Sequence, residues 1–134
     1  MLEDGKLADA KAAYAQAAAL ASAALEVSPG NSQLLSALEL YSAKEGLFHK
    51  AQQYQEKALR LAPHDLLVLL QAAMSEELAG KRQKALQFVE KALEAGASLQ
   101  TIDGTFELKG LRKDPAYARI AKEWGSSKGL HPTS

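Results

Sequence analysis

Residues 85–93 read Ala-Leu-Gln-Phe-Val-Glu-Lys-Ala-Leu, and their small and bulky positions recur along the chain at intervals of 34 residues. The two alanines of this stretch have earlier counterparts, which gives the sets Ala17, Ala51 and Ala85, and Ala24, Ala58 and Ala92. Further positions follow the same interval and are occupied by Leu25, Leu59 and Leu93, by Leu20, Tyr54 and Phe88, and by Pro29 and Pro63. Chance does not readily produce so many coincidences at one offset, so the chain is built from a repeated unit.

Each unit carries the apolar spacing of two successive helices. We expect these pairs at residues 32–45 with 49–61, and at residues 66–79 with 82–95. The first helix of each pair ends at a glycine, Gly46 or Gly80, a residue that suits a helix terminus. Asn31 or Ser32, and then Asp65, stand where a side chain can cap the first backbone N–H groups.

The first helix departs from this plan. Gly5 is a potential breaker, but the period places the turn at Ala12, inside a run rich in alanine. Gly5 and Ala12 lie seven residues apart, which is close to two helical turns. One uninterrupted helix over about residues 6–27 can therefore present the same side to its neighbour along its whole length. Such a helix looks like the second member of a pair whose first member is absent. Residues 1–30 are therefore either a partial repeat from a larger protein or an amino-terminal capping helix.

After Gly96 the period ends, and a helical lid is expected. Ser98 or Thr101 can begin a short helix through Ile102, Thr105 can cap residues 106–109, and Asp114 followed by Pro115 predicts a helix over 115–124. Six side chains offer apolar surface to cover the last repeat: Phe106, Leu108, Leu111, Tyr117, Ile120 and Trp124. Residues 125–134 are rich in glycine and serine, which predicts a flexible tail.

The 34-residue period, the helix pairs and the stretch 85–93 together resemble the tetratricopeptide repeat (TPR) family over residues 31–97. The sequence departs from the family pattern where Glu39 replaces a small residue, Ser42 and Glu76 replace a bulky one, and Gln55 replaces an aromatic. The resemblance implies an all-α helical-repeat solenoid, an α-α superhelix with a carboxyl-terminal helical cap. Its expected single domain covers residues 1–124, divided into 1–30, repeats 31–64 and 65–97, and the cap 98–124.

Residues 106–117 also resemble the closing stretch of TPR regions at the carboxyl ends of bacterial signalling proteins. Those proteins include membrane-linked serine/threonine kinases and transcription regulators. The resemblance implies that this module belongs to a larger signalling protein.

Composition narrows the classes of partner. The 134 residues contain 16 Lys and Arg against 16 Asp and Glu, so the chain lacks the positive field with which proteins collect nucleic acid. No apolar run is long enough to insert into a membrane. There is no cysteine, which excludes disulfides and thiolate metal sites and is compatible with the cytoplasm. We expect a soluble chain that binds no nucleic acid, and its compartment stays open.

The sequence indicates no catalytic or metal site, so we expect neither enzyme activity nor a cofactor. His49, His64 and His131 are isolated from one another, with none at the helical spacing that metal ligands use. Glu76 and Glu77 are neighbours on a helix and point in different directions, which does not suit an acid/base pair.

The resemblance implies instead a concave binding groove lined by the first helix of each pair. The residues that would face it are Gln33, Ser36, Ala37, Leu40, Lys44, Leu67, Leu70, Gln71, Met74 and Leu78. Only Lys44 matches the cationic and amide residues with which some family members grip a peptide carboxylate, so an apolar or amphipathic peptide is expected there. Two functions follow: a protein-binding scaffold, or a homo-oligomerisation module in which a second copy covers these residues, giving a homodimer.

Overall fold

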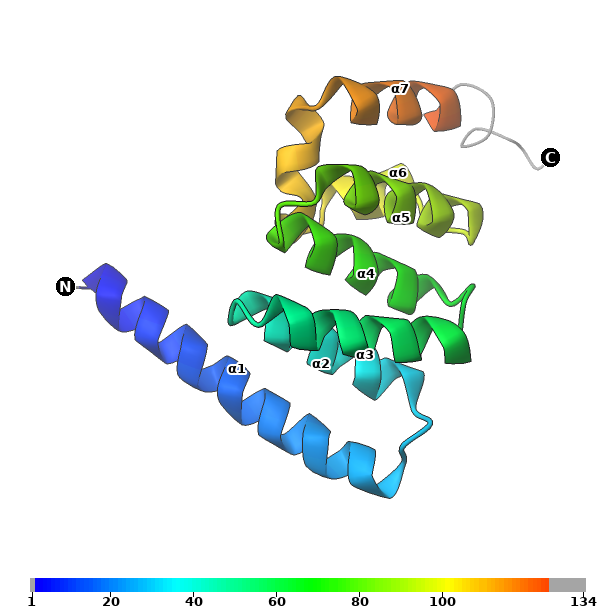
Figure 1. The fold of residues 1–134 in the computed structure, drawn as a ribbon. Coiled ribbons are helices and arrows are strands. Elements are labelled where there is room, and N and C mark those ends of the chain that lie inside the picture. Colours follow the sequence, from blue (N-terminus) through cyan, green and yellow to red (C-terminus); the bar gives the residue numbers. More distant parts are fainter. Residues whose placement is uncertain (1, 126–134) are drawn as a thin grey trace.

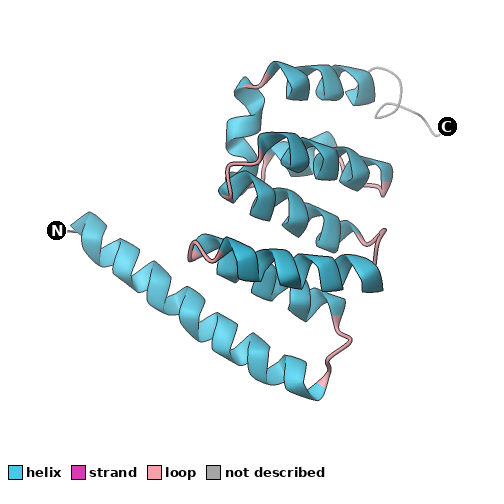
Figure 2. Ribbon diagram, in the orientation of Figure 1, coloured by secondary structure: helices cyan, strands magenta, loops and turns pink. Residues whose placement is uncertain are grey.

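The computed structural model describes residues 2–125, with side chains from residue 8 onward. This part of the chain consists of helices and short loops (Figures 1 and 2), so the predicted all-α class is confirmed. The elements are α1 (Leu2–Val27), α2 (Ser32–Lys44), α3 (Phe48–Leu61), α4 (Leu66–Leu78), α5 (Arg82–Glu94), α6 (Leu99–Asp103), the 3-10 helix η1 (Phe106–Lys113) and α7 (Pro115–Glu123). They stack in one direction from α1 to α7 (Figure 1). Apart from Gly125, the predicted tail lies outside the described residues.

Helix α1 is a single helix of 26 residues, which confirms the prediction of one uninterrupted element. Its predicted start is wrong, because the helix begins at Leu2 and continues through Gly5. A glycine inside a helix costs only about 1 kcal/mol relative to alanine. The alanine run that follows is the best helix-forming sequence available, and it offsets that cost.

The two predicted helix pairs form as α2 with α3 and α4 with α5. Asn31, not Ser32, caps α2, since its Oδ1 accepts hydrogen bonds from the N–H groups of Gln33 and Leu34 at 3.0 and 3.1 Å. Asp65 caps α4 by accepting a hydrogen bond from the Val68 N–H at 3.0 Å. Gly46, with a φ of 82°, supplies the left-handed backbone that ends the first helix of a pair.

The repeated alanines lie where the helices of a pair meet. Ala51, Ala58, Ala85 and Ala92 are all buried, with at most 1% of their surface exposed. Leu35 of α2 packs in one cluster with Ala58 of α3. A small residue on the second helix thus lets a leucine of the first helix approach closely, which explains the period in physical terms.

Three of the four departures from the TPR pattern form a polar network in the core. Gln55 of α3 donates hydrogen bonds through its Nε2 to Glu39 Oε2 at 2.8 Å and to Glu76 Oε2 at 3.0 Å. Glu39 lies on α2 and Glu76 on α4, so the network joins three helices of two successive pairs. All three residues are buried.

The carboxyl-terminal segment covers α5, as predicted for a lid. Leu86, Val89 and Leu93 of α5 pack with a set of buried side chains from that segment: Ile102, Leu108, Leu111, Tyr117 and Ile120. Arg82 ties this segment to the last pair, because it binds Glu77 at 2.6 Å and Asp114 at 3.1 Å.

Two details of the predicted lid are wrong. Phe106 is 70% exposed and does not cover the last repeat; its ring lies beneath the ammonium group of Lys109. Thr105 makes no side-chain cap, since its hydroxyl instead donates a hydrogen bond to the carbonyl of Thr101, and the helix that follows is of the 3-10 type.

Candidate functional site

The predicted groove residues lie on two helices that pack against each other, α2 and α4. We call the ten residues the α2/α4 face. Gln33, Leu67 and Leu78 are exposed, whereas six others are half-buried: Ala37, Leu40, Lys44, Leu70, Gln71 and Met74. Ser36 is buried.

Ser36 therefore requires a correction. Its exposed fraction is 0%, so its side chain cannot touch a partner in this conformation. Its Oγ, like Oε1 of Gln71, is a buried oxygen without a hydrogen-bond partner in the described part of the chain. Ser36 lies at the edge of the face. Helical spacing alone could not predict that this edge position would be buried.

Lys44 is already engaged by other parts of the chain. Its Nζ lies 2.6 Å from Oε2 of Glu107 in η1 and donates a hydrogen bond to the hydroxyl of Tyr14 in α1 at 3.0 Å. Burial alone would lower the pKa of Lys44, but the hydrogen bonds to Glu107 and Tyr14 outweigh burial and raise it. Lys44 thus stays charged and paired, and it fastens α1 and η1 to the end of α2.

The pKa of Glu107 shifts in the opposite direction from that of Lys44. Burial alone would raise its pKa, but the hydrogen bond from Lys44, a backbone hydrogen bond and the positive charge of Lys44 together outweigh burial and lower it. The ion pair is consequently formed at neutral pH. Neither Tyr14 nor Glu107 belongs to the 34-residue repeats that predict the groove, so the repeat pattern alone could not predict this contact.

The most accessible apolar surface of the face is on α4. Leu67 and Leu78 are 42% and 37% exposed. Leu70 and Met74 lie between them in sequence and pack partly against the cluster of buried side chains under η1 and α7. Spacings of three or four residues place all four on one side of the helix, so they form an apolar row.

The side chains of this face are mainly apolar or uncharged. Lys44 is its only charged residue and is neutralised by Glu107. Among the described residues, no group of three or more His, Cys, Asp or Glu side chains could hold a metal ion. In that same range, no helix is long and apolar enough to cross a membrane.

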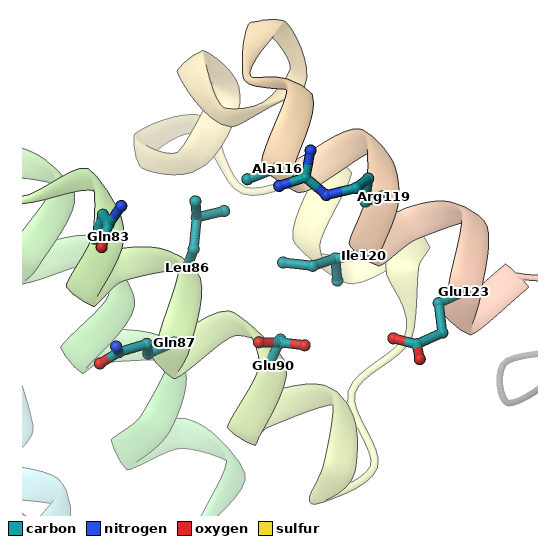
Figure 3. Close-up of a pocket in the computed structure, with 8 residues that line it drawn as sticks. All are labelled: Gln83, Leu86, Gln87, Glu90, Ala116, Arg119, Ile120 and Glu123. Atoms are coloured by element: carbon teal, nitrogen blue, oxygen red, sulfur yellow. The ribbon is translucent and has the colours of Figure 1, made fainter.

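A pocket lies between α5 and α7 (Figure 3) and has a volume of about 530 Å³. Leu86, Ala116 and Ile120 provide its apolar surface, and its polar lining consists of Gln83, Gln87, Glu90, Arg119 and Glu123. The sequence did not indicate this pocket, because its lining depends on how α7 packs against α5. It shares no residue with the α2/α4 face.

Comparison with protein-family models, with curated proteins and with solved structures gave no match to this chain.

Proposed function

We propose that the chain is a TPR-like module that holds an apolar or amphipathic helix of a partner protein on the α2/α4 face. The 34-residue period and the two successive helix pairs support the family resemblance. The observation that carries the function is the apolar row on α4, where Leu67 and Leu78 remain substantially exposed. Exposed leucines aligned on one side of a helix favour contact with another apolar surface.

A helix is the ligand that suits this row. Its side chains at spacings of three, four and seven residues can lie against Leu67, Leu70 and Met74 as ridges against grooves. Burying a large aliphatic side chain gives about 1.5–3 kcal/mol, and the half-exposed leucines can each supply part of that amount. Methionine adds a flexible surface that adapts to different partners.

The absence of a free charge on the face defines the contact further. Because Lys44 is paired with Glu107, none of the ten residues offers an unpaired cation to the terminal carboxylate of a partner peptide. The contacting side of the partner helix is therefore apolar. The resemblance of residues 106–117 to bacterial signalling proteins supports a scaffold role within such a protein, without enzyme activity of its own.

The test compares capture of partners by three forms of the chain: the natural sequence, Leu67→Glu, and Leu61→Glu as matched control. Leu61 is also an exposed leucine, at 53%, but it ends α3 and lies outside the α2/α4 face. A carboxylate in a buried contact is costly, so Leu67→Glu should lose a partner that Leu61→Glu retains. The helix of that partner should then bind the purified chain directly. Equal capture by both variants would contradict the proposal.

A further inference from the structure

Helix α1 has 26 residues, whereas the helices of the two pairs have 13 or 14. Its length is thus that of a complete pair without a turn. In the register of the repeat, residues 11–13 stand one period before residues 45–47, which form the turn between α2 and α3. At this place the chain stays helical. Helix α1 accordingly has the form of a helix pair that is opened into one straight helix.

The second half of α1 has an uncovered side. Ala24 is exposed, although its counterparts Ala58 and Ala92 in α3 and α5 are 0% exposed. Leu20 and Val27 on the same half are 71% and 84% exposed. The other side, which includes the buried Ala21, packs on α2. What α1 lacks is the helix that covers the repeated alanine in each later pair.

The first half of the same α1 cannot cover this side, because it continues straight away from it (Figure 1). We propose that a second copy of the chain does so. The two α1 helices lie antiparallel, and the first half of each packs on the second half of the other. This arrangement is a reciprocal exchange of the first helix of a pair, and it rests on a surface distinct from the α2/α4 face.

The later pairs define how the two copies align. Glu39 opposes Gln55 across the α2–α3 pair, where they are hydrogen-bonded, and the midpoint between them is Leu47. One period earlier, this midpoint is Ala13. The two-fold axis of the dimer therefore passes close to Ala13, and the two Ala13 side chains approach each other.

The composition of α1 suits such a contact. Eleven alanines lie between Ala8 and Ala24, and small side chains let two helices approach closely. Asp9, Lys11 and Glu26 are the only charged residues from residue 8 to the end of the helix. The helix is about 39 Å long. A symmetric pair with its axis at Ala13 therefore offers an extended interface that buries Leu20 of each copy.

A single cysteine at the axis tests the geometry, since the natural chain has none. Ala13→Cys should form a disulfide-linked dimer under mild oxidation. Ser22→Cys is the matched control, because Ser22 is exposed on α1 but lies about 200° around the helix from Ala24. It should remain largely unlinked. Equal cross-linking of both variants, or none of either, would overturn the proposal.

Light scattering at micromolar concentration tests the association itself. The natural chain should have the mass of a dimer, and Leu20→Glu should halve that mass while its helical circular dichroism persists. Ser22→Glu should stay dimeric. A monomeric natural chain, or a dimeric Leu20→Glu variant, would overturn the inference.

The turn of the later pair offers an independent test. Residues 45–47 are Glu, Gly and Leu, so the combined substitutions Lys11→Glu, Ala12→Gly and Ala13→Leu place the same turn in α1. The first half should then fold back on its own second half and give a folded monomer. If this variant remains dimeric, exchange through α1 is wrong. Partner capture by the α2/α4 face should be the same in Leu20→Glu, so the two proposals fail separately.

Discussion

At the scale of single residues, the buried network of Glu39, Gln55 and Glu76 shifts the pKa of Glu39. Burial raises the pKa of Glu39 to about 8, hydrogen bonds from Gln55 and Ser75 lower it in part, and the neighbouring charge of Glu76 raises it again. Glu39 is therefore mostly protonated at neutral pH. The sequence shows that polar residues occupy positions where the family has other types, but it does not show that one glutamine joins two carboxyl groups from different repeats.

This ionisation makes stability depend on pH. The folded chain holds the Glu39 proton more tightly than the unfolded chain, whose pKa is near the ordinary 4.5. The folded chain is thus more stable at acid pH, and its free energy of unfolding should fall by about 2–4 kcal/mol as pH rises from 5 to 8. Urea unfolding at several pH values measures this slope.

The Glu39→Gln variant isolates the cause, because glutamine keeps an acceptor for Gln55 and cannot ionise. It should remove most of the slope and be more stable than the natural chain at pH 8, while differing little at pH 5. Glu94→Gln, an exposed glutamate at the end of α5, should retain the slope. An unchanged slope in Glu39→Gln would assign the pH dependence to other groups.

At the scale of helices, local signals predict the elements well. Asp65 followed by an apolar run, Gly46 and Gly80 at helix ends, and Asp114 before Pro115 each have a direct backbone reason. Contacts between distant elements are different. The pairing of Lys44 with Tyr14 and Glu107 depends on how α1 and η1 meet α2, which no local spacing contains.

The carboxyl-terminal lid should stabilise the last helix pair. Ending the chain after Ala97 would expose Leu86, Val89 and Leu93 of α5 and remove their partners under α6, η1 and α7. Since each large apolar side chain contributes about 1.5–3 kcal/mol on burial, the loss should be several kcal/mol and should lower Tm strongly. A chain that ends at Gly125 is the control and should melt like the natural one. An unchanged Tm after the larger truncation would contradict the role of the lid.

At the scale of the whole molecule, we propose that two apolar surfaces contact different partners. Lys44 of the α2/α4 face contacts both Tyr14 of α1 and Glu107 of η1 through its Nζ. The uncovered side of α1 lies at the end of the stack (Figure 1). The period predicted the helix pairs, and the residues of the first surface are those that the TPR resemblance implies. Only the exposures of Leu20, Ala24 and Val27, which depend on the assembled fold, identify the second.

Met74→Glu tests whether partner binding and self-association use different surfaces. Met74 is half-buried on the α2/α4 face and packs partly against the cluster under η1. A carboxylate there can still reach water in the free chain, so we expect a loss of about 1–2 kcal/mol in stability with the fold retained. In a complex the same charge would be buried without a partner, which costs more. Partner capture should therefore fall much further than stability.

Three measurements on Met74→Glu separate the alternatives: urea unfolding, light scattering and partner capture. A folded dimer that has lost its partner supports both proposals, because association depends on α1 and binding on the α2/α4 face. Unfolding of the variant would mean that Met74 belongs to the core, and the binding role of the face would then be wrong. A folded monomer would mean that two copies meet through the α2/α4 face, because the substitution leaves the exposed side of α1 unchanged. That outcome would replace both proposals with a single self-association surface.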